Sequence, residues 1–326
     1  MTLLVSRGSE ASERGRTIAF LGCGNLSTAI LCGILSSLSP SQSNSQPYAT
    51  GADDLITPTR FIACIRGPQS ARRIQKATEP YTSFSVEIIQ NDNIRGVQES
   101  DVIILGCKPY MLKTVLDVPG MREVLKGKLL ISILAGTSEQ QIEDILYPSG
   151  AVDSTPIEDR CRVVRAMPNT AAMVRESMTV IGAPSPPLQD GWGKLIDWIF
   201  TRIGRVVYLP PECMDASTAL AGSGPAFMAL ALEGIVDGAV AMGLPRAEAL
   251  IMAAQVMRGA STMALGGEHP AHIKEKISTP GGCTIGGLLV LEENAVRGSM
   301  ARAVRETTVI ASQLGRGLKN VNGTRY

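Results

Sequence analysis

The sequence is poor in residue types on which whole classes of protein depend. Aromatic residues make up 4% of the 326 residues, only two residues are histidine, and 31 Lys plus Arg balance 30 Asp plus Glu. Nucleic-acid binding needs a basic patch with interleaved aromatic side chains, so no nucleic-acid partner is predicted. His269 and His272 have no cysteine or carboxylate array near them, so no metal site is predicted either.

Paired cysteines are also missing. The seven cysteines form no CxxC pair and their number is odd, which argues against a disulfide framework and against a zinc site. Most of them lie in apolar, strand-like or glycine-rich segments. These features predict a reduced, intracellular protein, which we place in the cytoplasm.

A long uninterrupted hydrophobic run is absent as well. Residues 17–35 are apolar and follow Arg14 and Arg16, but Gly22 and Gly24 interrupt them in the middle. The apolar run before Gly22 has the length of a strand, so the segment is predicted to form a strand, a turn and a helix rather than a signal peptide or a membrane span. No membrane association is predicted.

The sequence does contain a regular alternation of short apolar runs and helical patterns. Strands are predicted at 18–21, 61–65, 102–105, 129–134, 163–166 and 178–181, with helices at 25–38, 69–78, 111–125 and 138–146. Further helices are predicted at 190–203, 226–242, 246–265, 271–277, 284–293 and 296–314. The fold class is therefore α/β, with an N-terminal Rossmann-type doubly wound sheet followed by an all-helical domain.

The segment IAFLGCGNLSTAI places two glycines between a predicted strand and a predicted helix. Gly22 permits a tight turn, and Gly24 lets the backbone approach a pyrophosphate at the helix N-terminus. Ser27, a small residue, replaces the third glycine of the dinucleotide-binding fingerprint. Dinucleotide binding is the favoured interpretation, and a strand–turn–helix without a ligand is the alternative.

The end of the next predicted strand favours a phosphorylated dinucleotide. A site for NAD needs an acidic residue there to bind the ribose 2′-hydroxyl, but Arg66 occupies the position and Arg72 and Arg73 follow on the helix. Arginine suits a 2′-phosphate, so NADPH is predicted ahead of NADH, which stays possible. At least one of Arg72 and Arg73 is expected to be a solvated charge instead.

Three further strand ends carry small or turn-forming residues, at 106–109, 135–137 and 167–170. The carboxyl ends of parallel strands share one edge of a sheet, so these ends predict a common crevice. No catalytic triad, carboxylate pair or activated thiol stands out. Hydride transfer fits this absence, because it depends on positioning more than on acid–base groups.

A second glycine-rich turn, TPGGCTIGG at residues 279–287, precedes a predicted helix. So many glycines are not needed in a loop that only connects two elements. They allow backbone N–H groups to come close to a ligand.

Together these motifs resemble the Δ1-pyrroline-5-carboxylate reductase family. The resemblance covers about residues 17–315 and rests on FLGCGNLSTAI, SDVIILGCKP, VVRAMPNTAAMVRE, AGSGPAF, DGAVAMGLPRAEAL and ISTPGGCTIGGLLVLEE. It implies an NAD(P)H-binding Rossmann domain and a helical domain that forms an interlocked homodimer or a higher homo-oligomer. The implied reaction is the reduction of 1-pyrroline-5-carboxylate to L-proline, the last step of proline biosynthesis.

The resemblance also implies the ligand-binding residues. For the cofactor these are Leu21, Gly22, Cys23, Gly24, Asn25, Leu26, Arg66, Asn93 (at the adenosine ribose), Gly106, Cys107, Lys108, Pro109, Ile133, Leu134 and Ala135. For the substrate they are Thr279, Gly282, Cys283 and Thr284. We expect N–H groups of this loop to hold the carboxylate of the cyclic imine. The Thr284 hydroxyl, the catalytic group, is expected to hydrogen-bond the ring nitrogen. No acidic residue stands out as the proton donor, which leaves solvent as one source and the donor open.

The predicted domains follow from these assignments. Residues 1–16 form a flexible N-terminus, residues 17–210 an NADP-binding Rossmann-like domain, and residues 211–326 a helical domain for dimerisation and substrate binding. Residues 39–59 and 147–160 are polar and unpatterned, and are predicted to be surface insertions without a chemical role. Small residues on several faces of the C-terminal helices suit packing against a second subunit.

Other functions stay open at this point. Lys276 and Glu212 depart from the family pattern, which leaves room for a related cyclic imine in a specialised pathway. Another two-domain NADP-dependent enzyme, such as a β-hydroxyacid dehydrogenase, needs a catalytic lysine near an asparagine, and neither Lys274 nor Lys276 has that neighbour one turn away. A non-enzymatic dinucleotide-binding protein does not need the intact loop at 279–287.

Overall fold

The computed structural model describes residues 16–39, 57–148, 156, 159–188, 190–318 and 321–324. The predictions for the N-terminus at 1–16 and for the insertions at 39–59 and 147–160 therefore lie almost wholly outside the described residues. The chain divides into two compact units, of which the first comprises Met1–Gly222 with Thr308–Tyr326 and the second Ser223–Thr307. The predicted domain boundary at 210/211 stays a prediction.

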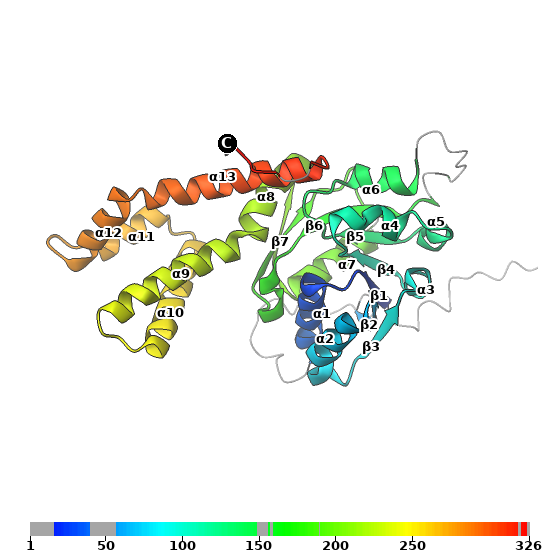
Figure 1. Ribbon diagram of the computed structural model, residues 1–326, viewed down its shortest axis with the longest axis horizontal. Coiled ribbons are helices and arrows are strands. Elements are labelled where there is room, and N and C mark those ends of the chain that lie inside the picture. The colour runs from blue at the N-terminus through cyan, green and yellow to red at the C-terminus, as the bar shows by residue number, and fades with distance from the viewer. Residues whose placement is uncertain are drawn as a thin grey trace, which may run out of the picture. The chain divides into compact units, whose positions relative to one another are not determined.

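The first unit is built on an eight-stranded sheet in the order β3-β2-β1-β4-β5-β6-β7-β8 (Figure 1). The strands are β1 (Arg16–Leu21), β2 (Pro58–Ile65), β3 (Ser85–Gln90), β4 (Val102–Leu105), β5 (Leu129–Ser132), β6 (Arg162–Met167), β7 (Ser177–Gly182) and β8 (Gly204–Leu209). Strands β1 to β6 pair in parallel, and the strand order reverses between β1 and β4. The predicted doubly wound sheet is confirmed, and ligands bind such sheets outside the carboxyl ends at the reversal.

Two strands and one pairing differ from the sequence prediction. β7 runs antiparallel to β6, and β8 pairs in parallel with β7. β3 and β8 were not predicted, and both are edge strands. Each is only partly buried along its length, so neither forms the continuous apolar run that marks a strand buried on both faces.

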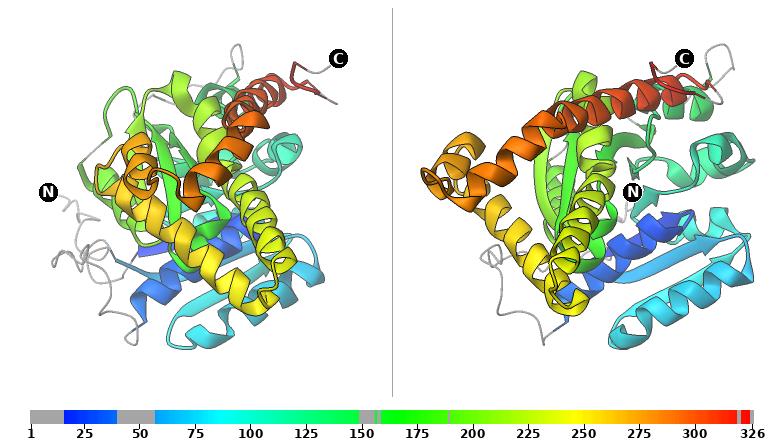
Figure 2. Two further views of the ribbon diagram at one scale, coloured as in Figure 1. Left: turned by 90° about the vertical axis from the view of Figure 1, so that its left-hand side faces the viewer. Right: turned by 60° about the vertical axis from the view of Figure 1, so that its left-hand side comes forward.

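Helices cover both faces of this sheet (Figures 1 and 2). They are α1 (Asn25–Leu38), α2 (Pro68–Thr78), α3 (Asn93–Gln98), α4 (Leu112–Leu116), α5 (Met121–Leu125), α6 (Glu139–Leu146), α7 (Asp190–Thr201) and α8 (Met214–Ser217). Phe20 of β1 packs in one core with α1, α2 and α7, whereas its neighbour Leu21 packs in the other core with α3 to α6. Successive strand residues thus face opposite layers, as a sheet buried on both sides requires.

The single helix predicted at 111–125 is wrong. The chain forms a short 3₁₀ turn at Pro109–Met111, then α4, and then α5 after an interruption. Gly120 at that interruption has φ 88°, in the left-handed region, and follows Pro119. α4 ends at Leu116 with Asp117 as its C-cap, and Gly120 is the N-cap of α5, so the apolar periodicity continues over two separate helices. Pro119 between them has no backbone N–H to continue α4.

The second unit is helical throughout its secondary structure. It contains α9 (Gly224–Ala241), α10 (Arg246–Leu265), α11 (Pro270–Ile277), α12 (Cys283–Glu293) and the first part of α13 (Val296–Gly315). These bounds agree with the predicted helices to within two residues at each end. Helices α9 and α10 follow one another as a hairpin and bury Val236, Ala249 and Ala253 between them (Figure 2).

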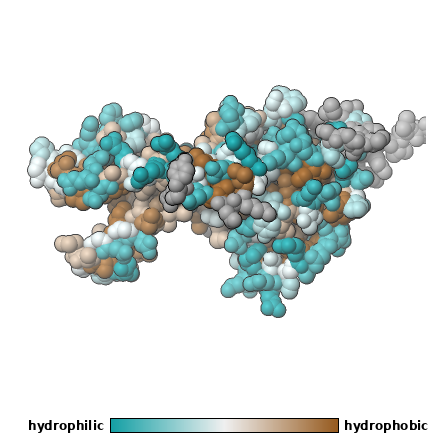
Figure 3. All heavy atoms as spheres, turned by 45° about the horizontal axis from the view of Figure 1, so that its top comes forward, coloured by the Kyte–Doolittle hydropathy of each residue, from teal (hydrophilic) through white to brown (hydrophobic). Residues whose placement is uncertain are grey.

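Few of the apolar side chains of the second unit are buried within it. Leu230, Ile251 and Val256 are 68%, 70% and 69% exposed, and Figure 3 shows hydrophobic residues on the outside of this unit. An exposed apolar surface of this kind is typical of a protein–protein interface.

Among the described residues one helical stretch, Pro211–Ala241, passes the length and hydropathy test for a membrane span. An apolar helix covered by protein passes the same test.

Candidate cofactor and substrate sites

The turn between β1 and α1 requires a glycine at its first position for two reasons. Gly22 has φ +83°, and a Cβ there would lie 2.7 Å from the backbone N and Cα of Cys107. The N–H groups of Gly22 and Cys23 both donate to the Cys64 carbonyl oxygen, at 3.2 Å each. The turn is therefore held against the ends of both neighbouring strands, β2 and β4.

Ser27 interlocks with the end of β4. The buried Ser27 hydroxyl donates to the Gly22 carbonyl oxygen at 3.1 Å. A Cβ added to Gly106 would lie 2.1 Å from this same Oγ and 3.3 Å from Cδ1 of Ile133. The first turn of α1 and the end of β4 can approach so closely only because residue 106 has no side chain.

The N-terminus of α1 carries no anion of its own. Its N-cap is Gly24, no side chain caps the helix, and the first turn contains no acidic residue. By contrast, Asp92 caps α3, and Ser138 caps α6 in a reciprocal capping box. Uncompensated N–H groups at the start of a helix attract a phosphate, so α1 offers an anion site at the carboxyl edge of the sheet.

The strand ends that the resemblance assigns to the cofactor lie side by side. The N–H of Gly106 donates to the Leu21 carbonyl at 2.9 Å, and the N–H of Ile133 donates to the Leu105 carbonyl at 3.0 Å. Ile133 and Leu134 are buried, whereas Lys108, Pro109 and Ala135 are exposed. The carboxyl ends of β1, β4 and β5 are thus hydrogen-bonded side by side, with buried apolar side chains beneath exposed residues.

Arg66 is the cation at the end of β2. It is exposed, its carbonyl oxygen accepts a hydrogen bond from Nε2 of Gln90 at 3.1 Å, and α2 begins two residues later with Gly67 as an N-cap that makes no side-chain bond. Burial raises the pKa of the Cys107 thiol to about 11, and the charge of Arg66 partly opposes that rise. The Arg66 charge therefore acts on the end of β4, along the edge that holds the other cofactor candidates.

The two arginines on α2 differ in their surroundings. Arg72 is exposed and is the solvated charge that the sequence led us to expect. Arg73 is half-buried, and its Nη2 donates to the carbonyl oxygen of Cys23 at 2.7 Å. No sequence motif indicates this bond, because it depends on how α2 packs beside α1.

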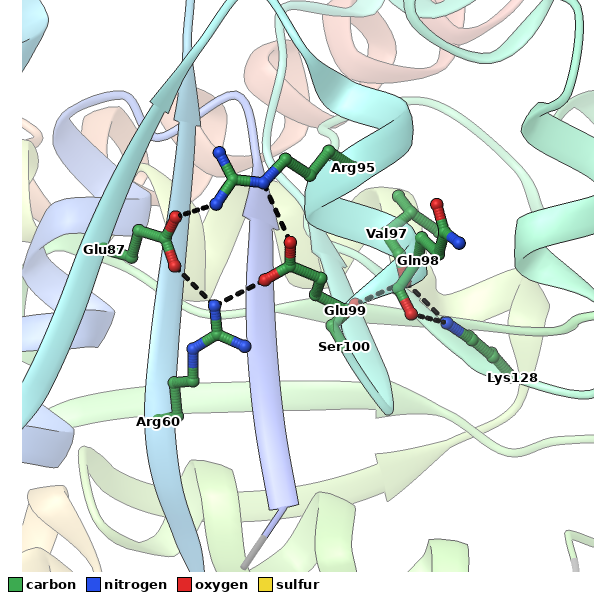
Figure 4. Close-up of polar contacts among 8 residues, drawn as sticks. All are labelled: Arg60, Glu87, Arg95, Val97, Gln98, Glu99, Ser100 and Lys128. Carbon is green, nitrogen blue, oxygen red and sulfur yellow. Dashed lines mark hydrogen bonds and ion pairs between the residues drawn. The ribbon is translucent and has the colours of Figure 1, made fainter.

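Asn93 is the first residue of α3, a helix fixed at both of its ends. Oδ1 of Asp92 accepts a hydrogen bond from the N–H of Arg95 at 3.0 Å. At the other end, Nζ of Lys128 donates to the carbonyl oxygens of Val97 and Gln98, at 2.6 and 3.2 Å (Figure 4). The position of Asn93 is therefore set before any ligand binds.

Four charged side chains reinforce the same helix from outside. Arg60 of β2 and Arg95 of α3 alternate with Glu87 of β3 and Glu99 (Figure 4). Nε of Arg95 lies 2.8 Å from Oε1 of Glu99, and Nη2 of Arg60 lies 2.5 Å from Oε2 of the same carboxylate. The two arginines lower the pKa of Glu99. These residues form a supporting network, not a catalytic one.

A polar cluster around the buried Arg165 of β6 was not predicted. The N–H of Arg165 donates to Oε1 of Glu139 at 2.9 Å, and its Nη2 lies 3.4 Å from Oδ1 of Asp215. Burial raises the pKa of Glu139. An arginine inside the apolar run VVRAM was the available signal, because a buried charge needs a partner.

The predicted substrate loop leads into α12, in the second unit. Gly282 is the N-cap, its N–H donates to the Thr279 carbonyl at 3.0 Å, and no side chain caps the helix. Cys283 and Thr284 are the first two helical residues, the former exposed and the latter half-buried. The first turn contains no acidic residue, so its N–H groups suit a small carboxylate.

The described part of the chain has no cluster of metal ligands, and Cys23 and Cys64 are buried thiols. It contains no group of three or more His, Cys, Asp or Glu that could hold a metal ion. Burial raises the pKa of Cys23 to about 11 and that of Cys64 to about 12. Both thiols therefore stay protonated at neutral pH and are poor nucleophiles.

Comparisons with known proteins agree on both parts of the chain. A pyrroline-5-carboxylate reductase dimerisation model matches residues 211–314, and a coenzyme F420-dependent NADP oxidoreductase model matches residues 17–136. A pyrroline-5-carboxylate reductase of Lophium arboricola is 57% identical over 99% of this chain and 100% of its own. One from Neurospora crassa is 51% identical over 95% of this chain and 96% of its own.

Solved structures share the fold. The pyrroline carboxylate reductase of Plasmodium falciparum with NADP bound has a TM-score of 0.72 at 22% identity, covering 92% of this chain and 98% of its own. The enzyme of Coxiella burnetii has a TM-score of 0.70 at 25% identity, covering 92% and 99%. With a 57% identical relative matched along its whole length, the chain belongs to the pyrroline-5-carboxylate reductase family.

Proposed function

We propose that this protein reduces 1-pyrroline-5-carboxylate to L-proline with NADPH as the reductant, in proline biosynthesis. The observation that carries the proposal is a pair of helix N-termini, those of α1 and α12, each with a glycine N-cap and with neither a capping side chain nor an acidic residue in its first turn. One has the surroundings of a dinucleotide site and the other carries the hydroxyl of Thr284 in its first turn. The names of the relatives support the proposed reaction.

The residues at the carboxyl edge of the sheet fit a dinucleotide. Gly22 and Gly106 let the turn, α1 and the end of β4 pack closely, whereas nothing lies within 4 Å of a Cβ at Gly24, so a ligand can approach the backbone there. The start of α1 supplies N–H groups for a pyrophosphate. Arg66 and the uncapped start of α2 favour a 2′-phosphate, and Asn93 is assigned to the adenosine ribose. When bound, NADPH supplies the hydride that reduces the imine carbon.

The substrate residues are assigned to the start of α12. N–H groups after Gly282 hold the substrate carboxylate, and Thr279 and Cys283 border it. The Thr284 hydroxyl donates a hydrogen bond to the ring nitrogen and so orients the imine. The nitrogen takes its proton from solvent, which matches the absence of an acidic residue in this turn.

The second unit supports a homodimer or a higher homo-oligomer. Its exposed apolar side chains, such as Leu230 and Ile251, leave a surface that a second copy of the chain would cover. The match to the dimerisation model over residues 211–314 supports the same partner. A cytoplasmic location is part of the proposal and is supported by seven free cysteines.

The departures from the family pattern do not favour another substrate. Nζ of Lys276 lies 2.5 Å from Oε1 of Glu268, so the lysine adds no unpaired charge near the loop. Glu212 is exposed in a short 3₁₀ turn at Pro211–Cys213. No observation therefore favours a related cyclic imine over 1-pyrroline-5-carboxylate.

The proposal is tested by following NADPH absorbance with the purified protein and 1-pyrroline-5-carboxylate, together with the proline formed. Equal amounts of NADPH consumed and proline produced are expected. Oxidation of NADPH only on a keto acid would point to the hydroxyacid dehydrogenase alternative. Binding of NADPH without turnover on any of these substrates would point to the non-enzymatic one.

A further inference from the structure

Arg73 links α2 to the cofactor turn across fifty residues of sequence. Its Nη2 donates to the Cys23 carbonyl oxygen at 2.7 Å. Its Nε is buried and has no hydrogen-bond partner among the described residues. The side chain therefore lies along the turn rather than in solvent, unlike the exposed Arg72 next to it.

The bond completes the support of the central peptide of the turn. On one side, the N–H groups of Gly22 and Cys23 are held by the Cys64 carbonyl. On the other, the Cys23 carbonyl is directed to α2 by Arg73. A carbonyl oxygen carries partial negative charge. Beside an anion site it repels an anionic ligand unless it points away from that site. Arg73 keeps it turned away and places a positive charge behind the turn.

Arg66 and Arg73 are thus available for different tasks. The side chain of Arg66 is exposed and has no hydrogen bond or ion pair among the described residues, whereas a donor of Arg73 is already used on the protein backbone. An arginine that reads a 2′-phosphate needs its planar pair of donors free.

Resting on the proposed function, we propose that Arg73 is a positioning residue for the dinucleotide pyrophosphate, acting through the Cys23 carbonyl, and that it does not read the 2′-phosphate. The pyrophosphate is common to NADPH and NADH. Loss of Arg73 must therefore weaken both cofactors equally, whereas loss of a 2′-phosphate reader weakens NADPH alone.

The test compares Arg73→Met, Arg73→Lys and Arg66→Met with Lys76→Met, a control that removes an exposed cation from the same helix. Dissociation constants for NADPH and NADH are measured for each variant, with the thermal midpoint as a check on folding. Arg73→Met is expected to raise both constants about tenfold, equivalent to about 1.4 kcal/mol, and to leave their ratio unchanged. Arg73→Lys raises both less, because an ammonium still reaches the carbonyl.

The other variants separate the possible outcomes. Arg66→Met is expected to weaken NADPH only, and Lys76→Met neither cofactor. If Arg73→Met weakens the binding of NADPH and not that of NADH, the inference about Arg73 is overturned. A lower thermal midpoint with unchanged dissociation constants in both Arg73 variants would also overturn it, and neither outcome would touch the proposed function. Should Arg73→Met not fold, Arg73→Lys takes its place in the comparison, and a rise confined to its NADPH dissociation constant would overturn the inference. Wild-type protein that binds neither dinucleotide would overturn the proposed function and this inference with it.

Discussion

The contact between Gly106 and Ser27 allows a sharp test of how the cofactor edge is built. A Cβ at residue 106 would lie 2.1 Å from Oγ of Ser27, far inside van der Waals contact, and 3.1 Å from the Gly22 carbonyl oxygen. Rotation of the Ser27 side chain would relieve the closest contact only by breaking its hydrogen bond to the Gly22 carbonyl, and that carbonyl belongs to the backbone of the turn. Gly106→Ala is therefore expected to destabilise the fold by about 2 kcal/mol, a typical cost of overpacking.

Removing the hydroxyl should relieve most of this strain. Ser27→Ala alone loses the hydrogen bond to the Gly22 carbonyl and is expected to cost about 1 kcal/mol. In Gly106→Ala/Ser27→Ala, the closest contact disappears and the tight contacts at 3.1 and 3.3 Å remain. The double variant should therefore cost at least about 1 kcal/mol less than the sum of the two single variants, because the residues touch.

The assay is denaturant unfolding of all four proteins, with the NADPH dissociation constant measured in parallel. Gly24→Ala serves as the glycine control for stability, since nothing lies within 4 Å of a Cβ at that position. Additive costs in the double variant, or a Gly106→Ala variant as stable as wild type, would refute the account of this contact.

Three further predictions concern residues outside the turn. Burial raises the pKa of Glu139 above its ordinary value of 4.5, so its contribution to stability is fully present below that pH and is lost as the pH rises through the folded-state pKa. Glu139→Gln should flatten this part of the stability–pH curve, and an unchanged curve would refute it. Lys128→Met leaves two carbonyl oxygens of α3 without their donor and should lower the free energy of unfolding by about 1–2 kcal/mol. The control Lys126→Met removes an exposed ion pair and should change that free energy much less; equal effects in the two variants would contradict this. Leu230→Lys places a charge on the exposed apolar surface of α9 and should reduce the oligomer measured by light scattering; an unchanged mass would count against that interface.

Much of the fold could be predicted because it depends on patterns among residues that are close together in the sequence. β1 and α1 were predictable because a strand-length apolar run meets Gly22 and a helical repeat. The helices of the second unit were equally clear from their length and from their glycine and proline boundaries, as between α9 and α10. Edge strands β3 and β8 were missed because partial exposure removes the apolar run on which the prediction depends.

The candidate site divides in the same way. The glycine turn at Gly22 and the loop before Thr284 carry their own sequence signals, since only glycine suits a left-handed turn or a close backbone approach. The bond from Arg73 to Cys23 and the cluster around Arg165 depend on tertiary packing, which places residues 50 positions apart in contact. No periodicity marks such pairs, so the structure was needed to separate Arg73 from Arg72.

The most direct test of the proposed chemistry is the turnover of Thr284→Ala on 1-pyrroline-5-carboxylate at saturating NADPH, beside wild type, Thr284→Ser and the exposed control Thr262→Ala. We predict NADPH-dependent proline formation by wild type and by Thr262→Ala. Turnover should fall about 100-fold in Thr284→Ala at an unchanged thermal midpoint, with most of it retained in Thr284→Ser. Wild-type turnover in Thr284→Ala would contradict the role of this hydroxyl, and no proline formation by the wild-type protein would contradict the proposed function itself.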